Sequence, residues 1–170
     1  RYSLTPKNAK QIEEADVVFW VGPYIETFLI KPIKNLNKKN NNVQISEIPK
    51  LIKYSTRSGD GFEEHDHDHG HHDDHDDHKA HKKHDDHGDN VDQHFWLDPE
   101  NAKIILDEIK NTLSKIDPEN SNLYEKNSIK AKKDIDVLIA STKIKLDNYG
   151  NTGFIYFHDA YQYFEKRFGL

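Results

Sequence analysis

The sequence predicts an α/β fold of two lobes of parallel sheet flanked by helices and joined by one long linking helix. Helix openings that pair a capping residue with proline recur along the chain. Two compact apolar runs rich in β-branched and aromatic residues are typical of buried strands in a parallel sheet. A single helical pattern also fills residues 117–148. We expect a nearly complete first lobe and a truncated second lobe.

The first lobe is assigned to residues 1–116. Thr5 and Pro6 open a helix, because threonine caps free N–H groups and proline suits the first helical position. The run ADVVFWVG then predicts a buried strand that ends before Pro23, which can start a second helix. The run NVQISEI at residues 42–48 predicts the next strand, so helices and strands alternate.

The pattern of cap and proline returns at Asp98-Pro99, ahead of an apolar stripe that runs to about Ile116. It returns once more at the start of residues 117–148, the predicted linking helix. At about 1.5 Å per residue this helix would exceed about 40 Å, which is more than one small lobe needs. Its length therefore suits a connection between two lobes.

Residues 149–170 are assigned to the start of the second lobe. The run GFIYFHDA predicts a strand, and a helix follows in which Tyr161, Phe164 and Phe168 fall on one face.

Between about residues 54 and 93 apolar side chains nearly vanish, so we expect a disordered insertion that cannot bury enough surface to offset the entropy of ordering. It holds most of the histidines of the chain: His65, His67, His69, His71, His72, His75, His78, His81, His84 and His87. A polar tract of this kind is often only a solvated charge run. The regular spacing of its imidazoles among carboxylates favours weak, multiple and exchangeable metal binding instead.

His94 and His158 are the candidate ligands of a defined metal site. His94 stands where apolar residues return, ahead of Phe-Trp-Leu and a capped helix, and His158 directly follows the predicted strand FIYF. Ligands of α/β folds collect at the carboxyl ends of strands. Either histidine alone is more often structural, but together with the tract they indicate a metal. Asp159 is the expected acceptor of an imidazole N–H.

Composition narrows the function further. The formal net charge is -6, and twelve Asp and Glu against three Lys lie within residues 60–90, so cations are better partners than nucleic acid. The absence of cysteine excludes thiolate zinc sites. The chain has no apolar run of transmembrane length and no signal peptide, and it begins at Arg1 instead of Met, so we expect a fragment or a processed product.

Several stretches together carry a family resemblance: QHFWLDPENA, GFIYFHDAYQYFEKRFGL, YSLTP and ADVVFWVGPYIETFL. They resemble the ZnuA-type zinc-binding subunits of bacterial ABC importers, the cluster A-I metal-binding solute-binding family, over essentially the whole chain. The resemblance implies two α/β lobes bridged by a long helix, one metal ion in the cleft between them, and His94 and His158 as ligands. It also implies a periplasmic, monomeric protein that is not an enzyme and that has an ABC permease as its membrane partner.

The chain also departs from the family pattern. The family has a further ligand histidine just before the segment that YSLTP matches, and some relatives have an acidic ligand late in the second lobe; neither position lies within residues 1–170. Two imidazoles do not complete a tetrahedral zinc shell, so we expect a longer native protein. Manganese-type relatives often place Glu where His158 stands, and histidine agrees better with zinc.

The composition, the candidate ligands and the resemblance leave three candidate functions. The leading hypothesis is a high-affinity Zn2+-binding protein that captures zinc outside the cytoplasmic membrane and delivers it to an ABC-type permease, with the tract as an accessory low-affinity collector or sensor. The second is a stand-alone zinc storage or buffering protein that uses the tract alone. The third, a zinc hydrolase, finds little support, because no HExxH motif and no obvious general base are present.

Overall fold

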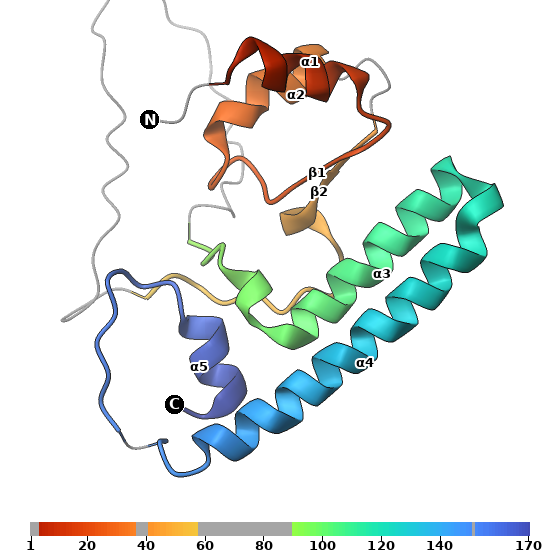
Figure 1. Ribbon diagram of the computed structural model, residues 1–170. Helices are drawn as coiled ribbons and strands as arrows, with labels where there is room; N and C mark the ends of the chain where they lie inside the picture. Colours follow the sequence, from red (N-terminus) through yellow and green to blue (C-terminus); the bar gives the residue numbers. More distant parts are fainter. Residues whose placement is uncertain (1–3, 37–40, 58–89, 151) are drawn as a thin grey trace, which may run out of the picture.

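The computed structural model describes residues 4–36, 41–57, 90–150 and 152–170 (Figure 1). The histidine-rich tract, residues 65–87, lies outside the described residues, and its metal binding therefore stays a prediction. Within the described residues no helix is both long and apolar enough to cross a membrane.

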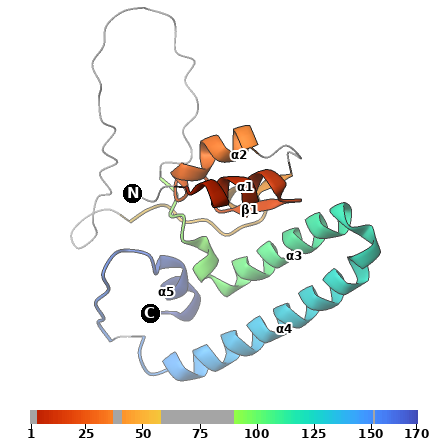
Figure 2. The ribbon, with the colours of Figure 1, turned by 45° about the horizontal axis from the view of Figure 1, so that its top comes forward.

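The N-terminal half contains α1 (Pro6–Glu14), β1 (Val18–Trp20), α2 (Ile30–Leu36) and β2 (Asn42–Gln44). The two strands are parallel, with Val18 opposite Asn42 and Trp20 opposite Gln44. In Figures 1 and 2 this pair lies between α1 and α2 on one side and α3 (Pro99–Ile116) on the other. A small parallel sheet with helices is therefore present, which confirms the α/β class.

The predicted opening of α1 is confirmed. The Thr5 hydroxyl accepts a hydrogen bond from the Asn8 backbone N–H at 3.2 Å, and the Asn8 side chain accepts one from the Thr5 N–H at 3.2 Å. This reciprocal capping satisfies two N–H groups that the helix itself leaves without partners.

The second helix begins later than predicted. Instead of starting at Pro23, the chain makes a turn in which the Glu26 N–H donates to the Gly22 carbonyl at 2.9 Å, and Gly22 adopts a φ of +147° that a side chain would oppose. The Glu26 carboxylate accepts from the Val21 N–H at 2.5 Å and so fixes this turn. Helical structure starts only at the 3-10 turn η1 (Thr27–Leu29).

The strand predicted over residues 42–48 is likewise shorter. β2 ends at Gln44, and a 3-10 turn, η2 (Ile45–Glu47), follows. The Ser46 N–H still donates to the carbonyl of Val21, the residue after β1, at 2.9 Å, while the Ile48 N–H donates to the Ile45 carbonyl at 3.0 Å and closes the turn.

In the C-terminal half, the 3-10 turn η3 (Phe95–Leu97) leads into α3, and η4 (Pro118–Asn120) leads into α4 (Ser121–Leu146). The helices α3 and α4 are antiparallel neighbours in both views (Figures 1 and 2). Interhelical ion pairs agree with this arrangement: Lys103 with Asp136 at 2.8 Å, Lys110 with Glu125 at 3.1 Å and Lys132 with Asp107 at 2.6 Å. The predicted long helix is thus present as α4, packed along α3.

The strand predicted in GFIYF is wrong for this structure. Residues 152–156 carry no regular secondary structure, and Ile155 and Phe157 are 101% and 98% exposed. A strand is held by hydrogen bonds to a neighbouring strand, and within the described part of the chain no strand lies beside this run. A second parallel sheet is accordingly not seen among these residues.

The predicted insertion is too long at both ends. Residues 54–57 and 90–92 form a short antiparallel pair: Ser55 bridges Val91, and the Thr56 N–H donates to the Asn90 carbonyl at 2.8 Å. Backbone pairing and burial of Asp92 and Gln93 order these residues despite their polar sequence.

The core that supports the site lies where η3, the start of α3 and α5 (Gln162–Phe168) meet. Phe95, Asn101 and Tyr163 are fully buried there. The Asn101 amide donates to the carbonyls of Ile52 and Phe95 at 2.8 and 2.9 Å and accepts from the Ile52 N–H at 2.8 Å.

An ion pair between the buried Asp98 and Arg167 borders this core. Asp98 caps α3 by accepting from the Glu100 N–H at 2.9 Å, and the same carboxylate accepts two hydrogen bonds of 2.7 Å from Arg167 of α5. The carboxylate raises the pKa of Arg167 above its usual value, so this guanidinium remains charged. The pair ties α5 to the N-terminus of α3.

Candidate metal centre

His94 and His158 lie side by side. Their ring centroids are 5.7 Å apart and the ring planes meet at 53°. Two imidazoles bound to one tetrahedral zinc ion through bonds of about 2.0–2.1 Å would have centroids about 5 Å apart. The observed spacing of the centroids is therefore slightly longer than that of two imidazoles that share a zinc ion. In the described ranges, no group of three or more His, Cys, Asp or Glu side chains converges to hold a metal.

The imidazole of His94 is oriented by Asp92, two residues earlier in the chain. One carboxylate oxygen of Asp92 accepts from the His94 backbone N–H at 2.9 Å and lies 2.8 Å from Nδ1 of the ring. Because a carboxylate is an acceptor, this contact places the proton on Nδ1 and leaves Nε2 with its lone pair. Trp96 packs beside the ring at 5.4 Å between centroids. His94 is thus prepared to act as a ligand through Nε2.

Asp92 is itself held by hydrogen bonds with three other residues. Its side chain is buried, and its second oxygen accepts from Gln162 Nε2 at 3.3 Å. Its carbonyl accepts from the Tyr163 hydroxyl at 2.7 Å, and its N–H donates to the Tyr54 carbonyl at 2.9 Å. A carboxylate fixed in this way holds the His94 ring in one orientation.

Asp92 lies inside the polar stretch assigned to the insertion, so it was not among the residues predicted for the site. A local signal does exist. An aspartate commonly accepts a hydrogen bond from the backbone N–H two residues ahead, and here the residue at that position is His94.

His158 occupies an exposed position in the segment that precedes α5. Its neighbours Tyr156 and Asp159 both bind Arg57, which stands at the end of the ordered strand pair. Asp159 was expected to accept an imidazole N–H, but its carboxylate accepts instead from Arg57 Nε at 2.9 Å and from an Arg57 terminal nitrogen. In the structure, the acceptor behind an imidazole is Asp92, and Asp159 anchors the segment that carries His158.

The charges near the two rings favour a cation. Asp92, Asp159 and Glu165 supply three carboxylates, against the single guanidinium of Arg57. The hydrogen bonds that Arg57 donates to Asp159 raise the pKa of its guanidinium above the usual range, so it stays protonated. Burial raises the pKa of Tyr163 to about 12, so its hydroxyl remains a neutral donor to the Asp92 carbonyl at neutral pH. A surplus of negative charge beside two imidazoles suits a divalent metal ion.

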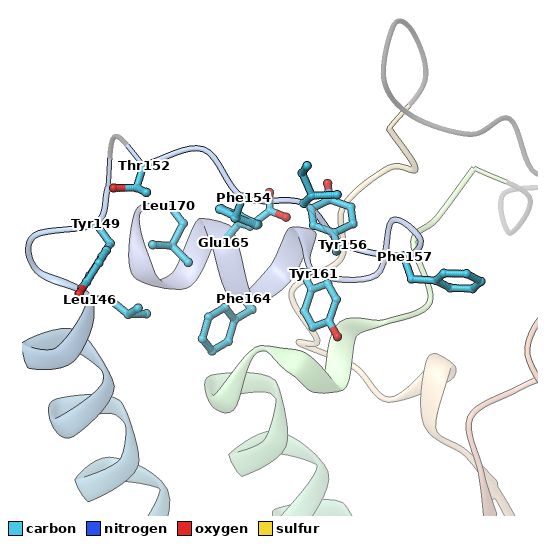
Figure 3. A pocket seen from close by; sticks show the side chains of 11 residues that line it. Leu146, Tyr149, Thr152, Phe154, Tyr156, Phe157, Tyr161, Phe164, Glu165 and Leu170 are labelled. Atoms are coloured by element: carbon cyan, nitrogen blue, oxygen red, sulfur yellow. The ribbon is translucent and has the colours of Figure 1, made fainter.

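An apolar cavity lies close to the metal centre but contains neither histidine. Figure 3 shows aromatic and aliphatic side chains around it, from the end of α4, the segment after it, and α5. Its volume is about 540 Å³, and Leu146, Phe154, Phe164 and Leu170 are among its lining residues. Of the four charged residues described beside the two rings, only Glu165 also lines the cavity. The cavity offers no imidazole to a metal ion.

The chain matches known proteins over essentially its whole length. The family model of the periplasmic zinc-uptake complex component A, ZnuA, matches residues 1–170. The high-affinity zinc uptake system protein ZnuA of Brucella abortus (strain 2308) is 45% identical over 182 residues, which cover 99% of this chain and 54% of that protein. The protein of the same name from Yersinia pestis is 30% identical over 169 residues, covering 99% and 52%.

Solved structures show the same fold. A zinc-bound ZnuA deletion mutant matches with a TM-score of 0.74 at 18% identity, over 99% of this chain and 54% of that one. A manganese-bound periplasmic metal-binding protein from Candidatus Liberibacter asiaticus matches with a TM-score of 0.71 at 19% identity, over 99% and 53%. The chain spans about half the length of the curated relatives it matches.

Proposed function

Because the chain belongs to the ZnuA family of periplasmic zinc-uptake components, we propose that it captures Zn2+ outside the cytoplasmic membrane and delivers it to an ABC-type permease. The observation that carries the proposal is the pair of His94 and His158, with ring centroids 5.7 Å apart and Asp92 behind the first ring. Zinc is the cargo of such a protein and undergoes no reaction there.

Zinc suits this pair for chemical reasons. Neutral imidazole is a good ligand for a borderline-soft cation, whereas Mg2+, Ca2+ and Mn2+ prefer carboxylate and carbonyl oxygens. The contact with Asp92 fixes the tautomer of His94 and increases the basicity of its free nitrogen. Two histidines fill half of a tetrahedral shell, and the remaining ligands are to be sought outside the described residues or in water.

A hydrolytic role is disfavoured by the partners of the nearby carboxylates. A zinc hydrolase needs a general base that can take a proton from metal-bound water. Asp92 is committed to His94, and Asp159 and Glu165 are committed to Arg57. This supports a binding protein over an enzyme.

We further propose that residues 1–116 form the first lobe, residues 117–148 the linking helix and residues 149–170 the start of a second lobe. The length of α4 and the position of His158 after it support this division. The histidine-rich tract within residues 65–89 is proposed as an accessory, low-affinity zinc collector or sensor, and the protein is proposed to act as a monomer.

The alternative of a zinc storage protein assigns all binding to the tract, so the two functions separate in one experiment. Zinc competition titrations compare the complete native protein with variants that carry His94→Ala or His158→Ala, and with a deletion of residues 65–89. Transport predicts that each alanine abolishes the tight site and that the deletion spares it. Storage predicts the reverse, and a tight site that survives both alanine substitutions would disprove the proposed ligand pair.

A further inference from the structure

We propose that Arg57 is a positioning residue for zinc capture. Its guanidinium holds the segment that carries His158 against the strand pair that leads to His94, so that the two rings are adjacent before the metal arrives. The inference rests on the proposed function of this histidine pair, and it assigns a role to a residue that does not touch the metal.

One side chain secures His158 from both sides. Arg57 donates to the Tyr156 hydroxyl at 3.1 Å, two residues before the histidine, and to Asp159, the residue after it, at 2.9 Å from Nε. It also binds Glu165 on α5, with contacts of 2.5 and 3.1 Å. The side chains of Arg57, Asp159 and Glu165 are only 21%, 11% and 13% exposed, so solvent weakens these contacts less than it would on an open surface.

Besides these polar contacts, the segment around His158 is held by looser aromatic packing, such as that of Tyr156 beside Tyr161 at 5.7 Å between ring centroids. It has no regular secondary structure before α5, and its apolar side chains Ile155 and Phe157 are fully exposed, so hydrophobic packing does not hold them. Without the polar contacts, metal binding would have to order this segment and would lose affinity in doing so. Holding it in advance removes that cost.

The backbone segment that carries Arg57 is hydrogen-bonded to the segment that leads to His94. The neighbouring Thr56 N–H donates to the Asn90 carbonyl at 2.8 Å, and the Asp92 N–H donates to the Tyr54 carbonyl at 2.9 Å. The residue that orients His94 and the residue that anchors His158 therefore belong to the same short antiparallel pair. Arginine suits this position because its planar guanidinium reaches several acceptors at once, which the single ammonium of lysine does not.

The test compares Arg57→Gln with a matched control, Arg167→Gln. Both arginines bind an aspartate in two contacts and both join the last residues of the chain to an earlier segment, but Arg167 pairs with Asp98 and not with the neighbours of His158. Zn2+ affinity is measured by competition in the complete native protein, and Co2+ absorption spectra report the geometry of the ligand set. Thermal unfolding of the metal-free proteins measures the stability loss of each variant separately.

We expect Arg57→Gln to lower Zn2+ affinity about 10- to 100-fold, in the range seen for residues that orient metal ligands. Arg167→Gln should lower stability with less than about a threefold effect on affinity. In a His158→Ala background, Arg57→Gln should change the residual affinity by less than about twofold, because a residue that acts through His158 has nothing left to position. Arg57→Lys, which keeps the charge, should not restore the affinity.

Three results would overturn the proposal: unchanged affinity in Arg57→Gln, an equal loss in Arg167→Gln, or the same loss with and without His158. If Arg57→Gln does not fold, Glu165→Gln and Tyr156→Phe each remove one contact of the guanidinium and are subject to the same criteria. The His158→Ala protein alone tests the proposed function. A tight site that persists there refutes the ligand assignment, whereas a site lost there but intact in Arg57→Gln refutes only the positioning role.

Discussion

Replacing Asp92 with asparagine or alanine tests whether the carboxylate behind His94 sets the metal affinity. One oxygen of Asp92 meets both the backbone N–H and Nδ1 of His94, at 2.9 and 2.8 Å. The side-chain oxygen of asparagine can accept both hydrogen bonds, so the ring keeps its orientation and the negative charge is lost. Alanine removes the orientation as well. The two variants therefore separate the effect of charge from the effect of geometry.

The expected magnitudes follow from these contacts. Loss of a group that orients a metal ligand typically costs about 10- to 100-fold in affinity, which corresponds to about 1.4–2.8 kcal/mol. Asp92→Asn should fall near the lower value and Asp92→Ala near the higher one. Asparagine would also turn its amide nitrogen toward Gln162 Nε2, which now donates to the carboxylate at 3.3 Å. Two facing donors should lower the free energy of unfolding by about 1 kcal/mol or more, separately from the metal.

The assay is a Zn2+ competition titration paired with urea unfolding of the metal-free protein. Asp117→Asn provides the control. Asp117 also accepts two side-chain hydrogen bonds, from Asn120 and Tyr124 at 2.7 Å each, but it caps the C-terminal end of α3, whereas His94 lies ahead of the N-terminal end. Figure 1 shows the turn between α3 and α4 far from α5, the helix that follows His158. Its substitution should leave zinc affinity unchanged. If both Asp92 variants bound zinc as the original protein does, the carboxylate would have no part in preparing His94.

Three further outcomes are expected. Burial raises the pKa of Tyr163 to about 12, against an ordinary value near 10. The neutral phenol therefore contributes stability that is fully present below about pH 10 and is lost as the pH rises through 12. In Tyr163→Phe, the free energy of unfolding measured in urea should decline less steeply over that interval. Asn101→Ala should lower the free energy of unfolding by about 1–3 kcal/mol, since it leaves buried backbone groups without partners; an unchanged urea midpoint would contradict this. Zinc titrations at pH 7.5 and 5.5 should lose the weak sites of residues 65–89 before the tight site of His94 and His158, because protons compete more effectively with a weakly bound metal ion than with a tightly bound one; persistence of only the weak sites would make the tract the main site.

The elements that the sequence predicts well are those decided by neighbouring residues. Thr5 with Pro6 and Asp98 with Pro99 open α1 and α3 as expected, because a cap and a fixed φ act within one helical turn. The GFIYF run is different. Its apolar residues satisfy the pattern of a buried strand, but a strand exists only beside another, and that condition depends on distant parts of the chain.

The candidate site shows the same division between local and distant information. The positions of His94 and His158 at the edges of apolar runs mark them as candidates, and the structure brings their rings together. The partner of Asp159 could not be found in this way. Proximity in sequence suggested the adjacent histidine, whereas the actual partner, Arg57, lies 102 residues away. Charge pairs of this kind leave no periodic trace in the sequence.

These contacts also bear on whether the tract or the histidine pair determines affinity. Residues 65–87 provide many imidazoles but almost no apolar side chains that could fix them, so their composition predicts that each bound ion must order its own ligands. The pair needs little such ordering. Asp92 sets the ring of His94, and Arg57 secures the residues on either side of His158, in both cases through groups that are largely buried. Prior organisation of this kind favours the pair by the entropy that the tract would have to lose, so we expect the tight site at His94 and His158 and additional weak binding in the tract.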